Sequence, residues 1–127
     1  MGAPRCAAFA DLNGDGRIDV VTSVLNGPAE LLLNTTANRN HWLLLDLQGT
    51  RSNRDGLGAK IELRAGGRIQ YNHATTSVGY GCSSDRRIHF GLGSASKADA
   101  ITIFWPSRHK QILKDIAADR VLKIREQ

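Results

Sequence analysis

The stretch KIELRAGGRIQYN, residues 60–72, decides the fold class expected for this chain. Apolar and polar residues alternate on both sides of a glycine pair, which is typical of two strands joined by a tight turn. Alternation places every second side chain on the same face of a strand. The segment therefore predicts a β-hairpin whose apolar residues point into a hydrophobic core: Ile61, Leu63, Ile69 and Tyr71.

Short apolar stretches on either side of the hairpin repeat this pattern. Residues 42–47 are apolar on nearly both faces, which is typical of a central strand, and further strands are predicted over 87–92, 99–105, 111–113 and 121–124. Several short strands at this spacing favour a mainly-β fold, in the form of an antiparallel β-sandwich or a barrel-like sheet. At 127 residues the chain is long enough to bury one core of this kind.

The stretch DLNGDGRID, residues 11–19, carries oxygen ligands at alternate positions. Calcium takes about six to eight oxygens from carboxylates, amides, backbone carbonyls and water. An EF-hand is excluded because position 12 of the loop is Thr22 rather than Glu and a β-branched segment follows. The alternative is a turn of Asp, Asn and Gly that holds no ion. The predicted calcium ligands are the side chains of Asp11, Asn13, Asp15 and Asp19 and the backbone carbonyl of Arg17.

The flanks of this loop resemble part of a β-propeller. Strands are predicted over residues 7–9, 18–24 and 30–34, and an Asn-Gly pair at 26–27 favours a turn between the last two. A calcium loop that runs directly into a strand resembles the FG-GAP (or VCBS) repeat of integrin-type propellers. We therefore expect residues 1–38 to be a propeller-blade fragment and residues 39–127 to be a second β domain. Because one blade cannot bury both of its faces, upstream blades of a longer chain are expected partners.

Four motifs after residue 39 resemble the ASPIC/UnbV domain. They are Asn40–Leu43, Gly49–Ala59, Ile88–Gly93 and Ile103–Ser107. That domain typically closes bacterial proteins whose upstream region is an FG-GAP/VCBS propeller, and it is also found in animal cartilage acidic protein. The resemblance implies an exported or cell-surface module with calcium in its propeller part, and it implies no particular reaction. The chain departs from the family pattern at Arg108, where Gly is usual, and at residues 81–83.

Two loops carry residues suited to bind a sugar or a carboxylate. An aromatic ring beside several Arg and Asp side chains offers a stacking surface with bidentate donors and acceptors. The alternative interpretation is that the Arg and Asp side chains only tie the two loops together. The candidate ligand-binding residues are Arg51, Arg54, Asp55, Tyr80, Asp85 and Arg86.

The net charge of +5 is unevenly distributed along the chain. Residues 1–40 hold three Arg and four acids, whereas residues 41–127 hold fourteen Lys and Arg and eight acids. A basic region of this kind suits a polyanionic glycan or nucleic acid, with a solvated strand face as the plain alternative. No nucleic-acid-binding motif accompanies the charge, so nucleic acid is not expected as a partner.

No constellation of residues argues for an enzyme. Cys6 and Cys82 lack metal-ligand spacing, and we expect them either to pair in an oxidising compartment or to be two buried thiols. The four histidines have no close spacing of the kind that marks a zinc motif. Neither a Gly-x-Ser-x-Gly sequence nor a phosphate-binding Gly-rich loop occurs. We therefore expect a non-catalytic protein.

Taken together, the motifs predict a calcium-binding β module of an exported bacterial protein, with Ca²⁺ as its cofactor. Its expected role is adhesion, or the binding of an extracellular protein or other ligand. The alternatives are a glycan-binding or accessory domain of a larger enzyme, and a module that forms homo-oligomers through open strand edges. The expected location is secreted, periplasmic or cell-surface. No apolar run approaches the roughly 18 residues of a membrane span, and the first residues do not resemble a signal peptide.

Overall fold

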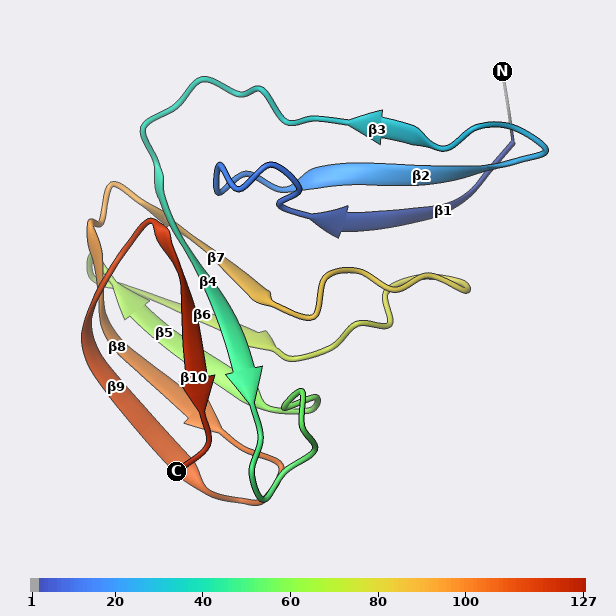
Figure 1. Cartoon of the computed structure of the whole chain (residues 1–127). Helices are drawn as coiled ribbons and strands as arrows, with labels where there is room; N and C mark the ends of the chain where they lie inside the picture. The colour runs from blue at the N-terminus through green and yellow to red at the C-terminus, as the bar shows by residue number, and fades with distance from the viewer. Residues whose placement is uncertain (1–2) are drawn as a thin grey trace. The chain divides into compact units, whose positions relative to one another are not determined.

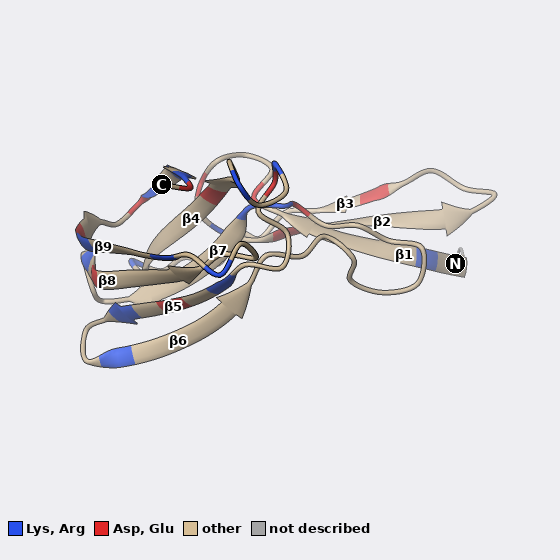
Figure 2. Ribbon diagram, turned by 90° about the horizontal axis from the view of Figure 1, so that it is seen from below, with Lys and Arg blue, Asp and Glu red and all other residues tan. Residues whose placement is uncertain are grey.

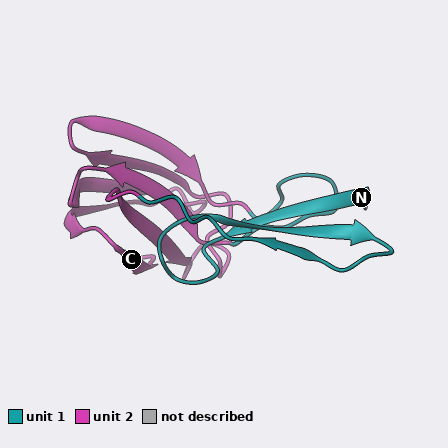
Figure 3. Ribbon diagram, turned by 90° about the horizontal axis from the view of Figure 1, so that it is seen from above, with its two compact units in different colours: residues 1–37, 76–85 teal, residues 38–75, 86–127 magenta. Residues whose placement is uncertain are grey.

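The computed structural model describes residues 3–127, and Figure 1 shows the strands along the chain. No helix occurs among these residues, and none of the three sheets closes into a barrel. The predicted mainly-β fold is therefore confirmed. The strands belong to two compact units, coloured teal and magenta in Figure 3: residues 1–37 with 76–85, and residues 38–75 with 86–127.

The described part of the chain has no helix long and apolar enough to cross a membrane.

The first unit contains one antiparallel sheet in the order β1-β2-β3. Its strands are β1 (Ala3–Ala10), β2 (Asp19–Leu25) and β3 (Glu30–Leu32). The β-branched residues of β2 favour an extended backbone. The turn that follows uses Asn26 in the left-handed conformation, with φ of 56°, which Asn tolerates better than most residues. The predicted calcium loop therefore connects two neighbouring strands of this sheet.

Residues 76–85 belong to the first unit because covalent and hydrogen bonds attach them to β1. Cys6 and Cys82 form a disulfide, so the alternative of two buried thiols is wrong. The backbone N–H of Asp85 donates to the carbonyl of Phe9 at 3.1 Å, and the N–H of Phe9 donates to Oγ of Ser84 at 3.0 Å. The sequence predicted two domains with a boundary between residues 38 and 39. The first compact unit also includes residues 76–85, so the two units are not consecutive segments of the chain, and the predicted boundary stays a prediction.

The second unit is built from two sheets. One has the order β10-β4-β7 and the other the order β6-β5-β8-β9. Every pair is antiparallel except β10 with β4, which run parallel. The strands are β4 (His41–Gln48), β5 (Lys60–Ala65), β6 (Arg68–His73), β7 (Ile88–Gly93), β8 (Lys97–Phe104), β9 (Lys110–Ala117) and β10 (Arg120–Arg125).

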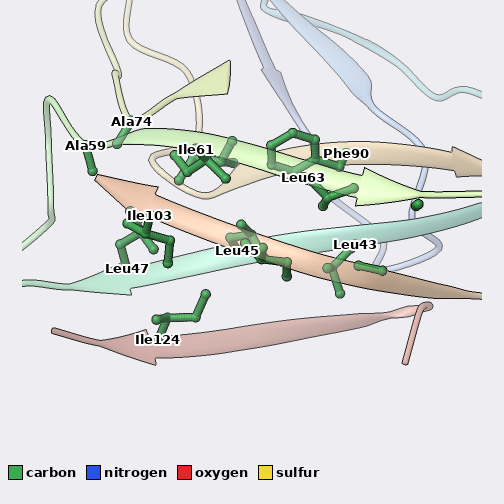
Figure 4. Packing of buried hydrophobic residues seen from close by; sticks show 14 of the residues in the cluster. Leu43, Leu45, Leu47, Ala59, Ile61, Leu63, Ala74, Phe90, Ile103 and Ile124 are labelled. Atoms are coloured by element: carbon green, nitrogen blue, oxygen red, sulfur yellow. The ribbon is translucent and has the colours of Figure 1, made fainter. Parts of the chain in front are cut away.

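Side chains from both sheets form a single buried apolar cluster in the second unit, shown in Figure 4. Alternate residues of β4, Leu43, Leu45 and Leu47, lie in this cluster together with Ile61 and Leu63 of β5. The strands β7, β8 and β10 contribute further aliphatic and aromatic side chains. This arrangement agrees with a β-sandwich, because each sheet turns its apolar face toward the same core.

Strand β6 departs from the prediction. The hairpin itself is present, but Tyr71 pairs with Glu62 and Ile69 pairs with Arg64, whereas Ile61 and Leu63 occupy the opposite face of β5. Tyr71 is 73% exposed, so the predicted inward orientation of Ile69 and Tyr71 is wrong. The reason is the register: cross-strand partners point to the same face, and the partners of both residues are charged side chains that face solvent.

Candidate functional site

Asp11 is the centre of the loop between β1 and β2. Its buried carboxylate accepts backbone N–H groups from Gly14 at 2.8 Å, Asp15 at 3.1 Å and Gly16 at 2.8 Å. Both glycines have positive φ, 78° and 84°, a conformation that costs a residue with a Cβ atom energy. The sequence therefore folds this loop around one carboxylate, which fixes the positions of the residues after it.

Asp19 closes the loop from its other end. Its buried carboxylate accepts the N–H of Leu12 at 3.0 Å through Oδ2 and the N–H of Asn34 at 2.8 Å through Oδ1. Asn34 follows β3, so one side chain joins the start of the loop, the start of β2 and the end of the sheet. Because buried carboxylates must be hydrogen-bonded, Asp11 and Asp19 are structural residues in this unit whether or not an ion binds.

Asp15 is the most accessible acid of the loop and lies against Arg17. Its Oδ2 accepts Nη2 of Arg17 at 2.6 Å and Nδ2 of Asn13 at 2.8 Å, and its Oδ1 accepts the backbone N–H of Arg17 at 2.9 Å. The backbone N–H of Arg17 is the main reason that the pKa of the Asp15 carboxyl lies below its ordinary value, against the opposing effect of burial. The carboxylate is therefore charged at neutral pH, and the cation that it binds in this structure is the guanidinium of Arg17.

The chemistry of the loop residues suits calcium, although Asp15 would have to release Arg17 to bind the ion. All predicted ligands are oxygens, and a carboxylate has about four acceptor sites, so the backbone donors on Asp11 and Asp19 leave acceptor capacity. In the described residues no group of three or more His, Cys, Asp or Glu side chains is arranged to hold a metal ion. Calcium binding would require Asp15 to exchange the guanidinium of Arg17 for the ion.

Three of the six predicted ligand-binding residues lie together in the second unit. Arg86 contacts Asp46 at 2.9 Å and Asp55 at 3.6 Å, and Nε of Arg54 lies 3.4 Å from Oδ1 of Asp55. These side chains line a hollow of about 440 Å³, whose other wall is the basic strand β10. Arg86 is thus neutralised by two carboxylates, and this geometry agrees with the alternative that the ion pairs hold the loops.

The other three predicted residues are not brought to this hollow. Tyr80 and Asp85 belong to the first unit, where Tyr80 is 95% exposed. Arg51 belongs to the second unit, and its backbone N–H donates to the carboxylate of Glu126. The six-residue ligand site therefore stays a prediction.

The structure contains a carboxylate cradle that the sequence did not reveal. Buried Glu126 accepts the backbone N–H groups of Thr50, Arg51 and Ser52, each at 2.8 Å, and the hydroxyls of Ser52 at 2.9 Å and Ser107 at 2.5 Å. Burial by itself raises the pKa of Glu126, but these donors outweigh it and hold the pKa well below its ordinary value. Consecutive N–H groups that converge on one anion form a nest.

This cradle explains two of the motifs singled out from the sequence. Thr50–Ser52 lies in one motif and Ser107 in another, and both converge on the residue that follows β10. An isolated Glu near the end of a strand carries no signal of its own.

Because Cys82 is bonded to Cys6, neither cysteine is a free thiol. His41 lies at the start of β4, where Nδ1 is 2.6 Å from Oδ2 of Asp119. The hydrogen bond from His41 is the main reason that the pKa of Asp119 is lowered. The same carboxylate accepts the backbone N–H of Trp42 at 3.2 Å, so this pair ties the turn before β10 to β4.

Comparison with known proteins covers the larger part of the chain. The family model described as ASPIC and UnbV matches residues 49–127, which include the cradle around Glu126. No curated protein matches the chain. The match begins after the loop at residues 11–19, so the resemblance of that region to an FG-GAP/VCBS repeat stays a prediction.

Proposed function

Because the chain belongs to the ASPIC and UnbV family, we propose that it is a non-catalytic binding module of an exported protein, stabilised by calcium in its first unit. The observation that carries the proposal is the loop at residues 11–19. Two buried carboxylates, Asp11 and Asp19, hold it in a fixed turn, while Asn13 is exposed and Asp15 is half-buried.

Calcium has a structural role in this proposal. The side chains of Asp11, Asn13, Asp15 and Asp19 and the carbonyl of Arg17 would hold it, and its charge would offset the three carboxylates of the loop. Since Asp19 also bonds Asn34 after β3, an ion in the loop would help to keep all three strands in register. The disulfide supports an exported location, because disulfides form and persist in oxidising compartments.

Exposed apolar side chains support the interpretation of the first unit as a blade fragment. Phe9, Leu25, Leu31 and Leu32 each lie on a strand of its sheet and are about half exposed. A propeller blade packs its two faces on neighbouring blades, which would cover such residues. In the alternative of self-assembly, a second copy of the chain would pair with the outer edge of β3, the last strand of this sheet.

The test is thermal unfolding in EDTA and in calcium up to several millimolar, because extracellular calcium sites often bind at only ~10⁻⁴–10⁻³ M. We expect calcium to raise the midpoint of the wild-type protein and to leave that of Asp15→Ala unchanged. Arg17→Ala is the matched variant, since it keeps the carbonyl ligand but removes the guanidinium that competes for Asp15.

For Arg17→Ala we expect calcium to bind about threefold more tightly, as is typical for the loss of one exposed ion pair. A flat response to calcium in both the wild-type protein and Arg17→Ala would overturn the calcium proposal. The loop would then be a turn held by Asp11 and Asp19 alone.

A further inference from the structure

We infer, on the basis of the binding module proposed above, that the outer face of the sheet β6-β5-β8-β9 binds an acidic polysaccharide. Tyr71 and Phe104 would stack on sugar rings. Lys60 and Lys110 would bind carboxylate or sulfate groups.

Strand register places these four residues close together on one face. Lys60 of β5 pairs with His73 of β6 and with Phe104 of β8, and Phe104 pairs with Lys110 of β9. This forms a row across the sheet, because cross-strand partners point to the same side. Tyr71 pairs with Glu62 and so lies in the next row. The apolar core occupies the opposite side of the same strands.

A hollow of about 460 Å³ lies on this face and is lined by both aromatic residues. Tyr71 is 73% exposed and Phe104 is 43% exposed, and Lys60, Glu62 and His73 also line the hollow. A space of this size lies in the range of small-ligand sites. It presents two rings with hydrogen-bonding side chains beside them, which is the equipment needed for a molecule with apolar ring faces and a polar rim.

The exposed aromatic rings of this face do not belong to the hydrophobic core. Residues of β6 alternate as if Ile69 and Tyr71 belonged to the core, yet the sheet turns both of them toward solvent. Ile112 of β9 is likewise exposed, in the same row as Tyr71. Single exposed apolar residues need no explanation, but a group on one sheet face indicates a binding surface.

The charges on this face select an acidic ligand. Lys60, Arg64, Lys110 and Lys114 lie in its three cross-strand rows, where Glu62 is the one acid and is bonded to Arg64 at 2.8 Å. Figure 2 shows blue and red alternating along β5, whose charged residues are Lys60, Glu62 and Arg64. Nζ of Lys110 lies 5.6 Å from the ring centre of Phe104, so a cation and a ring already adjoin.

Carbohydrate is favoured over nucleic acid, the other polyanion that stacks on aromatic rings and binds Lys and Arg. The disulfide between Cys6 and Cys82 suits an oxidising compartment rather than the cytosol or the nucleus, where nucleic acids are concentrated. No nucleic-acid-binding motif occurs in the sequence. The ligand class is therefore a polysaccharide that carries carboxylates or sulfates.

The test is isothermal titration calorimetry of the whole chain with polygalacturonate, which carries carboxylates, and with heparin, which carries sulfates. Dextran serves as the neutral control and oligothymidylate as the nucleic-acid control. We expect binding to at least one acidic polysaccharide, none to dextran, and weaker binding to oligothymidylate. The polysaccharide that binds more tightly shows whether the site prefers carboxylate or sulfate groups.

Two variants of aromatic residues test the location of the site. Tyr71→Ala is expected to lower the affinity about tenfold, while Phe9→Ala, which removes a partly exposed ring from the first unit, leaves it unchanged. Lys60→Ala and Lys110→Ala are expected to weaken binding and to reduce its dependence on salt.

Three results would overturn the inference: no binding to either acidic polysaccharide, equal effects of Tyr71→Ala and Phe9→Ala, or tighter binding to oligothymidylate than to both polysaccharides. Each titration is repeated in EDTA and in calcium. Binding that depends on Tyr71 with no thermal response to calcium would overturn only the calcium part of the proposed function. A thermal response to calcium without such binding would overturn only this inference.

Discussion

The two units of this chain are both β-sheet structures, but they exclude water to very different extents. In the second unit, Leu45 of β4 is completely buried, whereas in the first unit Leu32 of β3 is 56% exposed. The second unit has a continuous apolar cluster drawn from both of its sheets. The buried residues among the described part of the first unit are Asp11, Gly16, Asp19 and Cys82.

This contrast indicates that the units are stabilised by different interactions. Burial of apolar surface is the main favourable contribution to folding, and the second unit is stabilised by it through its apolar cluster. The first unit instead relies on a disulfide and on carboxylates that accept backbone N–H groups. Small domains without a sufficient core commonly need a disulfide or a metal. We therefore expect each unit to respond to agents that leave the other unchanged.

The largest expected effect is the loss of the disulfide. Cys6 and Cys82 are 76 residues apart, and closing a loop of that length is worth about 4 kcal/mol in the chain-entropy model. In the double variant Cys6→Ser and Cys82→Ser we expect the first unit to unfold and trypsin to cut rapidly after Arg17. Both tryptophans, Trp42 and Trp105, lie in the second unit, so its unfolding can be followed separately by fluorescence.

The fluorescence transition of the second unit should shift much less than the first unit is destabilised, because its apolar core remains in this double variant. Equal loss of stability in both units, or resistance of Arg17 to trypsin, would contradict the separation of the two.

A pair of leucine variants gives the next largest effect. Leu45→Ala removes a side chain from the centre of the cluster and is expected to destabilise the second unit by about 3 kcal/mol. Leu32→Ala removes an exposed side chain of the same size and is expected to change the first unit by no more than about 0.5 kcal/mol. Urea unfolding measures the first variant, and the trypsin rate at Arg17 measures the second. Similar losses in the two variants would show that the first unit has a core after all.

A smaller effect concerns the cradle around Glu126. In Glu126→Gln the amide cannot accept all five donors, and we expect the melting temperature of the second unit to fall by roughly 5–10 °C at pH 7. Glu62→Gln, at a glutamate on the sheet surface, is the control and should lower it by no more than about 2 °C.

The pH dependence of this difference follows from the lowered pKa of Glu126. A depressed folded-state pKa contributes stability that is present above the ordinary value of about 4.3 and is lost as the pH falls below it. The difference in melting temperature between the wild-type protein and Glu126→Gln should therefore become smaller as the pH falls below about 4.3. A gap that stays constant down to pH 2.5 would contradict the assignment.

The strands could be predicted from the sequence because alternation and β-branched residues mark them locally. The orientation of Tyr71 could not, since an edge strand carries the same alternation whichever face it presents, and only pairing with Glu62 settles it. The parallel pairing of β10 with β4 and the disulfide of Cys6 depend on residues far apart in the chain, for which one sequence holds no signal.

The candidate site was only partly predictable for a similar reason. The loop at residues 11–19 is local, so its spacing predicted a tight turn, but it did not predict that backbone N–H groups converge on Asp11. The six loop residues proposed to bind a ligand were selected by type, and the structure brings Arg54, Asp55 and Arg86 together at one hollow. The cradle of Glu126 joins residues about 75 positions apart, and nothing in the local sequence links them.

The most direct test of the difference between the units is amide hydrogen exchange of the wild-type protein, measured by mass spectrometry in EDTA and in millimolar calcium. We expect calcium to slow exchange in β1, β2, β3 and the loop at residues 11–19, and to leave β4, β5, β7 and β8 unchanged. Exchange in β1–β3 that is as slow in EDTA as in calcium would contradict a first unit stabilised by a bound ion. So would a calcium effect spread evenly over all the strands.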